Sequence, residues 1–259
     1  MSWECWVSQG LDPTYVKIGT QGAHVTETAG PQTVVEVLST LALRGVLVEI
    51  AEDFRASTSL NIAATYRSTN AALDLIAQGA SADLTILTRE AMARLERDGV
   101  VAAGTSVDLA QSGVGIAVRA GLAKPDIATV AALKHALLAA KSIAFSRQGA
   151  SGIHFAEVIE RLGIAEEVRR KATITDSYAG EAAARCEVDM AVQQISELVP
   201  IKGIDMVGPL PAELQKISVF AGGIFQAAKN AEGAGKLLAA LAAPELASAL
   251  IRNGLEPVA

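Results

Sequence analysis

Short apolar runs alternate along the chain with segments in which apolar residues recur at helical spacing. The β-rich run at residues 33–38 predicts a strand, and the apolar positions after it predict a helix to about Ser57. Alternating apolar residues from Leu60 to Tyr66 predict a half-buried second strand. This order predicts a parallel sheet with right-handed crossovers. The remaining elements of this first unit are a helix at 71–78, a strand at 83–87 and a helix at 89–98.

A second unit of the same kind follows. A strand at Gly113–Arg119 leaves the first unit, and Thr129 is placed to cap a helix over 130–140. A short strand over 142–145 precedes a loop and a helix that begins near Ile153. The later predictions are strands at 173–175, 190–193, 204–207 and 217–221, followed by helices at 231–242 and 245–252.

The two units together predict an α/β protein with two lobes and a ligand cleft between them. Because the chain crosses near residue 115 and returns near residue 216, we expect residues 33–115 and 216–259 to form lobe 1. Residues 116–215 are expected to form lobe 2, and residues 1–32, which lack core periodicity, an N-terminal extension. Ligands of such folds bind beyond the carboxyl ends of the strands or in the crevice between lobes.

Composition narrows the function classes. The chain has 259 residues, of which 51% are apolar and 4% aromatic, which is typical of Ala-rich α/β proteins. A net charge of −6 argues against a nucleic-acid-binding protein. No apolar run has the length of a membrane span, and the three histidines show no zinc spacing, so we expect neither a membrane span nor a metal or other cofactor.

The first residues bear on the compartment. They contain no basic region followed by a continuous apolar region, so the sequence as written lacks a signal peptide and predicts a cytoplasmic protein. A misassigned start would instead place the protein in the periplasm. Cys5 and Cys186 allow one disulfide, and whether they pair stays open.

The loop after the strand at 142–145 has the features of an anion site. Residues 147–152 are small and turn-forming, and they lead into a helix that Gly163 would end. Backbone N–H groups and the Ser151 hydroxyl would meet at the positive end of that helix, where anions bind. The alternative is that Ser151 only caps its helix, which serine commonly does.

Five segments together resemble the type II periplasmic substrate-binding proteins, and most closely the molybdate-binding-protein-like family. The resemblance covers about residues 33–257. It implies a two-lobed fold, a small anion bound in the interlobe cleft, no cofactor and, for a receptor, an ABC transporter permease as partner. The matching segments are Val37–Thr40 leading to Ile50–Phe54, Gly79–Leu84, Ser112–Val118, Gly149–Gly163 and Gly208–Leu214.

The resemblance also implies ligand-binding positions. This chain lacks the serine that the family carries in its first loop, and it has Gln193–Gln194 where the molybdate binders carry a tyrosine. These two departures argue against molybdate itself. Carried over by position, the five binding loops fall at Leu41–Leu43, Ser68–Thr69, Ala150–Gly152, Tyr178–Gly180 and Gln193–Gln194.

Arginines near these loops favour a carboxylate ligand. Arg44 and Arg67 flank the first two loops, and Arg147 flanks the third. The planar guanidinium group matches a carboxylate, whereas a tetrahedral oxyanion held by neutral N–H and O–H groups needs no arginine. We therefore expect a di- or tricarboxylate, with Arg44 and Arg67 as clamps. The alternative is that both arginines face solvent, as most do.

A branch of the same family includes aconitate isomerase, which implies a second hypothesis. Such an enzyme moves a proton between carbons of an unsaturated tricarboxylate and needs a base within hydrogen-bond reach of an acidic C–H group. Tyr66 and His154 are the candidate bases together with Tyr178, and Ser151 could assist through its hydroxyl. His154 could equally be an ordinary helix residue. The sequence leaves open whether the chain is a binding protein or an isomerase.

Overall fold

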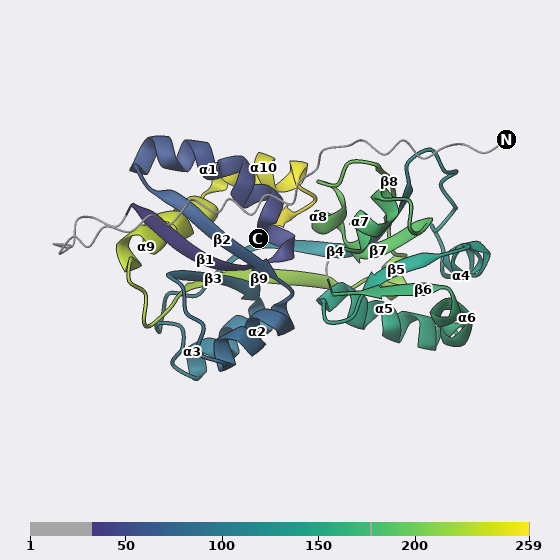
Figure 1. The fold of residues 1–259 in the computed structure, drawn as a ribbon, viewed down its shortest axis with the longest axis horizontal. Coiled ribbons are helices and arrows are strands. Elements are labelled where there is room, and N and C mark those ends of the chain that lie inside the picture. The colour runs from purple at the N-terminus through teal and green to yellow at the C-terminus, as the bar shows by residue number, and fades with distance from the viewer. Residues whose placement is uncertain (1–32, 177, 259) are drawn as a thin grey trace, which may run out of the picture.

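The computed structural model describes residues 33–176 and 178–258, and its long shape consists of two α/β halves side by side (Figure 1). The predicted extension at residues 1–32 lies outside this range. The strand order is β2-β1-β3-β9-β4-β7-β5-β6, with β8 and β10 also paired to β4. Lobe 1 here denotes the half that contains β1, β2, β3 and β9, and lobe 2 the half that contains β5 to β8.

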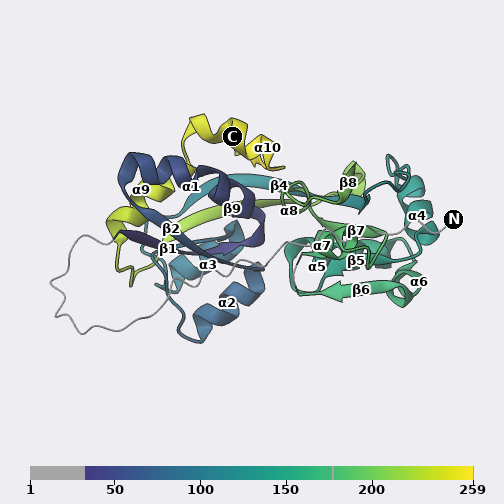
Figure 2. The ribbon, with the colours of Figure 1, turned by 45° about the horizontal axis from the view of Figure 1, so that its top comes forward.

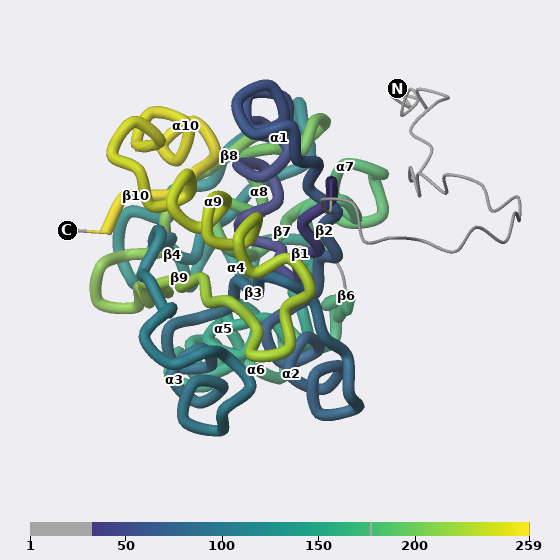
Figure 3. The backbone as a smooth tube through the Cα atoms, turned by 90° about the vertical axis from the view of Figure 1, so that its left-hand side faces the viewer, coloured from purple at the N-terminus to yellow at the C-terminus, as the bar shows by residue number. Residues whose placement is uncertain are grey.

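Lobe 1 is built on a parallel unit, as the sequence predicts. β1 pairs in parallel with β2 on one side and β3 on the other, and β9 runs antiparallel to β3. Helices α1, α9 and α10 cover one face of this sheet, and α2 and α3 cover the other (Figure 3). The elements are β1 (Val34–Thr40), η1 (Leu41–Leu43), α1 (Arg44–Thr58), β2 (Asn61–Arg67), α2 (Thr69–Ala77), β3 (Leu84–Thr88), α3 (Arg89–Arg97), β9 (Ile217–Ile224), α9 (Ala231–Leu241), η3 (Pro244–Leu246), α10 (Ala247–Arg252) and β10 (Glu256–Pro257).

Lobe 2 has its own apolar core. β5 pairs in parallel with β6 and β7, and a cluster that includes Phe145, Phe155 and Leu137 fills the space beneath α4, α5 and α6. A second cluster of mostly alanine side chains packs under α7 and α8. The elements are α4 (Val130–Ala139), β5 (Ile143–Ser146), α5 (Ala150–Arg161), α6 (Ala165–Arg170), β6 (Ala172–Thr175), α7 (Ala179–Ala184), β7 (Met190–Gln194), α8 (Ile195–Leu198), β8 (Ile204–Pro209) and η2 (Ala212–Leu214).

The long strand β4 (Val107–Arg119) joins the halves (Figure 2). Its residues up to Gly113 pair with β9 of lobe 1, and those from Val114 onward pair with β7 and β8 of lobe 2. Where these two parts of β4 meet, the Gln215 side chain takes the place of a neighbouring strand as hydrogen-bond partner. Its Oε1 accepts the Val114 N–H at 2.8 Å, and its Nε2 donates to the Val114 carbonyl at 2.9 Å.

Four elements differ from the sequence predictions in ways that have a physical reason. β4 begins six residues before Gly113, because its first part pairs with β9, a partner distant in sequence. α5 begins at Ala150 with Gly149 as its N-cap, so Ser151 lies inside the helix and the capping role considered for it is wrong. The short helices α6 and α8 were not predicted, because each has too few residues to show a periodic apolar pattern.

No single helix in residues 33–176 and 178–258 has the length and apolar character to span a membrane. Ala231–Leu241 and Pro244–Arg252 meet that test only as a pair, and the two are bent by 57°. Several residues of α9, such as Leu237 and Leu241, are buried in the lobe 1 core, which accounts for its apolar character.

Candidate functional site

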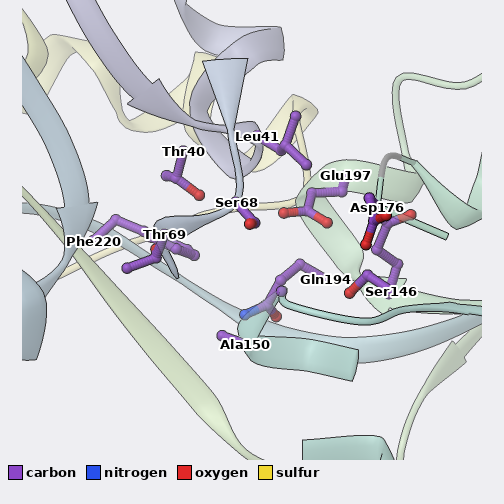
Figure 4. A pocket seen from close by; sticks show the side chains of 12 residues that line it. Thr40, Leu41, Ser68, Thr69, Ser146, Ala150, Asp176, Gln194, Glu197 and Phe220 are labelled. Carbon is purple, nitrogen blue, oxygen red and sulfur yellow. The ribbon is translucent and has the colours of Figure 1, made fainter. Parts of the chain in front are cut away.

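A cleft between the lobes is lined mainly by residues at or just after the carboxyl ends of strands from both halves (Figure 4). In α/β folds ligands bind at this edge of a sheet. The space between the atoms of this cleft, including the part that is open to solvent, is about 370 Å³. The lining residues are Thr40, Leu41, Ser68, Thr69, Ser146, Gly149, Ala150, Asp176, Gln193, Gln194, Glu197 and Phe220.

The lobe 1 wall is formed where β1 and β2 end. Thr40 is the last residue of β1, and Ser68 and Thr69 follow β2 at the start of α2. The Ser68 hydroxyl accepts the Ala71 N–H at 3.3 Å and so caps α2, which satisfies one of the free amides of its first turn. The N-terminus of α2 therefore points its positive end at the cleft.

The lobe 2 wall begins with unusually close packing between β5 and α5. A Cβ atom on Gly152 would lie 1.8 Å from the Ser146 carbonyl oxygen, and one on Gly149 would lie 2.5 Å from the Ser146 hydroxyl. Only glycine fits at Gly152, because the atom it meets belongs to the backbone. This contact holds the first turn of α5 at the cleft, and the first amides of a helix have no partner inside it.

Several buried polar atoms of the lobe 2 wall lack a hydrogen-bond partner. They are the hydroxyl of Ser146, the amide nitrogen of Gln193, and both the amide nitrogen and oxygen of Gln194. These side chains are 5% exposed or less, and buried polar groups are rarely left unpaired. Donors and acceptors that line a cleft and lack a partner are available to a ligand.

Glu197 of α8 is the most unusual residue in the cleft. Its side chain is 9% exposed and extends into the space between Ser68 of lobe 1 and Ser146 of lobe 2 (Figure 4). Burial raises the pKa of this carboxyl from 4.5 to about 7, and the nearby Gln193 amide partly opposes the rise. Among the twelve lining residues only Glu197 and Asp176 are of a charged type, and both are acidic.

Arg44 joins the lobes at the rim of the cleft. Its guanidinium carbon lies 6.0 Å from the centre of the Tyr66 ring in lobe 1 and 5.4 Å from that of Tyr178 in lobe 2. The Tyr178 hydroxyl donates to the Leu41 carbonyl at 3.3 Å. Burial raises the pKa of Tyr66 to about 12, and burial with the charge of Glu197 raises the pKa of Tyr178 as well.

A second interlobe contact lies in the loop before α5, where the Asn70 side chain donates to the Gln148 carbonyl at 3.3 Å. The two lobes are therefore in contact through Tyr178 and through Gln148, as well as through packing of α8 against η1 and α1. The Asn70 hydrogen bond is exposed, whereas the Tyr178 hydrogen bond is partly buried.

The structure brings some of the residues proposed from the sequence to the cleft and leaves others outside it. Leu41, Ser68, Thr69, Ala150 and Gln194 line the cleft. Arg44, Tyr66 and Tyr178 are not among the lining residues, but Tyr178 contacts the lining residue Leu41 and Arg44 contacts both tyrosine rings. Four further proposed residues also do not line the cleft, namely Arg67, Ser151, Gly152 and His154.

Each of these four has another environment. The exposed Arg67 guanidinium donates to the Tyr66 carbonyl at 2.8 Å. The His154 Nε2 lies 2.7 Å from the Leu214 carbonyl, and its Nδ1 lies 3.7 Å from Glu157. Ser151 and Gly152 are buried in the first turn of α5.

Sequence reasoning missed Ser146 and Glu197. Both had a signal, since Ser146 directly follows the predicted strand at 142–145 and Glu197 follows the strand at 190–193 by four residues. Nothing in the local pattern shows that either side chain is buried. In residues 33–176 and 178–258, no group of three or more His, Cys, Asp and Glu side chains is arranged to hold a metal ion.

Comparisons with known proteins agree with this architecture. The family model described as "Bacterial extracellular solute-binding protein" matches residues 35–256. A curated aconitate isomerase from Pseudomonas sp. is 33% identical over 237 residues, which cover 89% of this chain and 90% of that protein.

Solved structures show the same fold. The periplasmic molybdate-binding protein of Azotobacter vinelandii matches with a TM-score of 0.74 at 16% identity, over 87% of this chain and all of that one. The tungstate-binding protein from Desulfovibrio alaskensis G20 matches with a TM-score of 0.59 at 14% identity, over 89% of this chain and all of that one. The two-lobed α/β fold predicted from the sequence is thereby confirmed.

Proposed function

The chain belongs to the family of bacterial extracellular solute-binding proteins, and on that premise we propose that its interlobe cleft binds a small polycarboxylate anion. The observation that carries this proposal is the set of buried atoms without partners in Ser146 and Gln194. A ligand with several oxygen atoms would supply the missing partners. The N-termini of α2 and α5 favour an anion at this position.

Glu197 is compatible with an anion in the cleft. A carboxyl group with a pKa of about 7 is partly protonated at neutral pH, so it can donate a hydrogen bond to an anionic oxygen of a ligand. The positive charge of Arg44 near the cleft would attract an incoming anion.

The test is a panel of ligands read by thermal shift and by calorimetry. We expect trans-aconitate, cis-aconitate, citrate or tricarballylate to raise the melting temperature, because a ligand that binds only the native state stabilises it by mass action. Molybdate, tungstate and phosphate should raise it less. Binding of molybdate or tungstate above every carboxylate would contradict the proposal.

An isomerase is the second candidate function, because a curated aconitate isomerase is 33% identical over 89% of the chain. The same cleft would then hold an unsaturated tricarboxylate and shift a proton between its carbons. Incubation of the protein with trans-aconitate, followed by quantification of cis-aconitate, tests this candidate. No formation of cis-aconitate above the rate in buffer would exclude it.

A binding protein of this family would deliver its ligand to the permease of an ABC transporter, and we propose that partner and a periplasmic location for the binding-protein candidate. Fractionation of cells that express the native gene would test the location. Recovery in the cytoplasm alone would favour the isomerase.

A further inference from the structure

We propose that Glu197 is the acid–base residue of this cleft, which removes a proton from one allylic carbon of a bound unsaturated tricarboxylate and returns it to the other. This inference rests on the isomerase candidate described above. It replaces Tyr66, Tyr178 and His154, the bases that the sequence suggests, with a residue that only the folded structure identifies.

The position of Glu197 is the first support. α8 follows β7 directly, so the carboxyl group is held beside Gln193 and Gln194 at the end of that strand. The side chain projects into the cleft, toward the space between Ser68 and Ser146 (Figure 4). A ligand that binds the unpartnered atoms of Ser146 and Gln194 would therefore lie against Glu197.

The other candidate bases are placed less well. The His154 Nε2 lies within hydrogen-bond distance of the Leu214 carbonyl, and His154 does not line the cleft. Tyr66 has a pKa of about 12, so almost none of it is ionised at neutral pH. Asp176 lines the cleft but is exposed, and its carboxylate lies 3.5 Å from the Arg147 guanidinium. Among the described residues that line the cleft, Glu197 is the single buried titratable side chain.

The proton affinity of Glu197 suits the task. General acid–base catalysis is most efficient when the pKa of the catalytic group lies near the working pH. Burial places the pKa of Glu197 at about 7. The charge of Glu197 acts on Tyr178, on the loop before α7. Arg44 lies over the Tyr178 ring, and Asp176 after β6 lines the same cleft.

The proposed reaction balances without a cofactor. The Glu197 carboxylate takes a proton from the methylene carbon, and the electron pair of the broken C–H bond spreads over the three allylic carbons onto the ligand's carboxylate oxygens. The protonated Glu197 then gives the proton to the carbon that was vinylic, and the double bond has moved by one position. The amide of Gln194, the hydroxyl of Ser146 and the first amides of α5 are the donors that could stabilise the transient charge.

The test compares Glu197→Gln, Glu197→Asp and Glu213→Gln with the unmodified chain. Glu213 is an exposed residue of η2 that does not line the cleft, and it serves as the matched control. Conversion of trans-aconitate to cis-aconitate is followed by proton magnetic resonance, and affinity is measured by calorimetry with tricarballylate, which has no double bond to move. Melting temperatures verify that each variant is folded.

We expect Glu197→Gln to lower kcat by about a thousandfold, which lies within the range of general acid–base catalysis, and to change the affinity for tricarballylate less than tenfold. Glu197→Asp should retain part of the rate, and Glu213→Gln all of it. The dependence of kcat/KM on pH should show an ionisation near pH 7 that is absent from the residual activity of Glu197→Gln.

The other outcomes decide against the proposal in distinguishable ways. If the unmodified chain binds carboxylates but forms no cis-aconitate, the isomerase candidate and the role of Glu197 both fail, while the polycarboxylate proposal stands. If it binds no carboxylate, all three fail. If it forms cis-aconitate and Glu197→Gln does so at a similar rate, the assignment of Glu197 alone is wrong. If Glu197→Gln loses affinity as strongly as rate, Glu197 is a binding residue and not the acid–base residue.

Discussion

The two walls of the cleft differ in how far their polar groups are already satisfied. On the lobe 1 wall the Ser68 hydroxyl caps α2, and the rim residue Arg44 is held between two tyrosine rings. On the lobe 2 wall Ser146, Gln193 and Gln194 bury atoms that lack a partner. Of the unpartnered buried atoms in residues 33–176 and 178–258, all that line the cleft belong to lobe 2.

This difference indicates a division of labour. Lobe 1 presents an anion-binding frame whose geometry is fixed by its own hydrogen bonds. A buried polar atom without a partner costs about 1–3 kcal/mol, and a ligand that supplies the partner recovers that cost. The lobe 2 wall should therefore decide which ligand binds, and Glu197 on the same wall should decide in which protonation state.

The largest expected effect concerns the ionisation of Glu197. Its pKa is about 7 in the folded protein and near 4.5 in the unfolded chain, so the unfolded chain releases this proton at lower pH. The contribution of this group to the free energy of unfolding should therefore be greatest below about pH 4.5. It should fall by about 3 kcal/mol as the pH rises through 7. Glu197→Gln should lack this loss.

The measurement is denaturant unfolding of both forms between pH 4.5 and pH 8. The stability of Glu197→Gln relative to the unmodified chain should increase by about 3 kcal/mol over this range. A difference that does not vary with pH would show that Glu197 is not held in a buried site, and would weaken the contrast between the two walls.

The next effect compares one residue from each wall. Gln194→Leu should reduce affinity for the carboxylate ligand about thirtyfold or more, because hydrogen bonds to charged groups contribute about 1.5–3 kcal/mol. Thr69→Val, on the lobe 1 wall, should reduce it less. Without ligand, Gln194→Leu should be as stable as the unmodified chain or more stable, because it removes two unpartnered buried atoms.

Calorimetry and thermal unfolding of the two variants test this prediction, with Gln226→Leu as an exposed glutamine control. A larger loss of affinity in Thr69→Val than in Gln194→Leu would reverse the proposed division of labour between the walls.

The close packing of β5 against α5 gives a third effect. Gly152→Ala places a methyl group against the Ser146 carbonyl, and it should destabilise the protein by about 2 kcal/mol and shift the first turn of α5. Gly235→Ala in α9 is the matched control, since its Cβ would meet nothing closer than 4.0 Å. That change should stabilise the protein by about 0.4–1 kcal/mol. Denaturant unfolding of both variants measures the difference, and equal effects would contradict it.

The sequence predicted the parts of this molecule that depend on local pattern. The parallel unit of β1, β2 and β3 follows from apolar periodicity, and Ser68–Thr69 and Gln194 follow from strand ends together with the family resemblance. The family itself is confirmed by the matching model over residues 35–256. Strand ends are recognisable because turn formers and helix starts follow them at once.

The parts that were missed depend on tertiary contacts. The early start of α5 comes from glycines that let its first turn meet Ser146, and spacing alone does not show such an approach. Glu197 lies on α8, which packs against η1, an element far from it in the sequence. A glutamate after a strand is ordinarily exposed, so the local sequence does not indicate that the pKa of Glu197 is raised.

The smallest expected effect separates two arginines that the sequence treats alike. Arg44 contacts the rings of Tyr66 and Tyr178 and so joins the lobes, whereas Arg67 donates to the carbonyl of its neighbour Tyr66. An exposed cation–π contact is worth about 0.5–1 kcal/mol, so Arg44→Met should weaken interlobe closure and lower ligand affinity about fivefold. Arg67→Met should lower it less than twofold. Calorimetry gives the affinities, and small-angle scattering of the ligand-free variants gives the separation of the lobes.

Because Arg44 contacts one tyrosine from each lobe, a loss of affinity confined to Arg44→Met would show that the two walls act on the ligand only when the lobes are closed. An equal or greater loss in Arg67→Met would instead return both arginines to the role of carboxylate clamps.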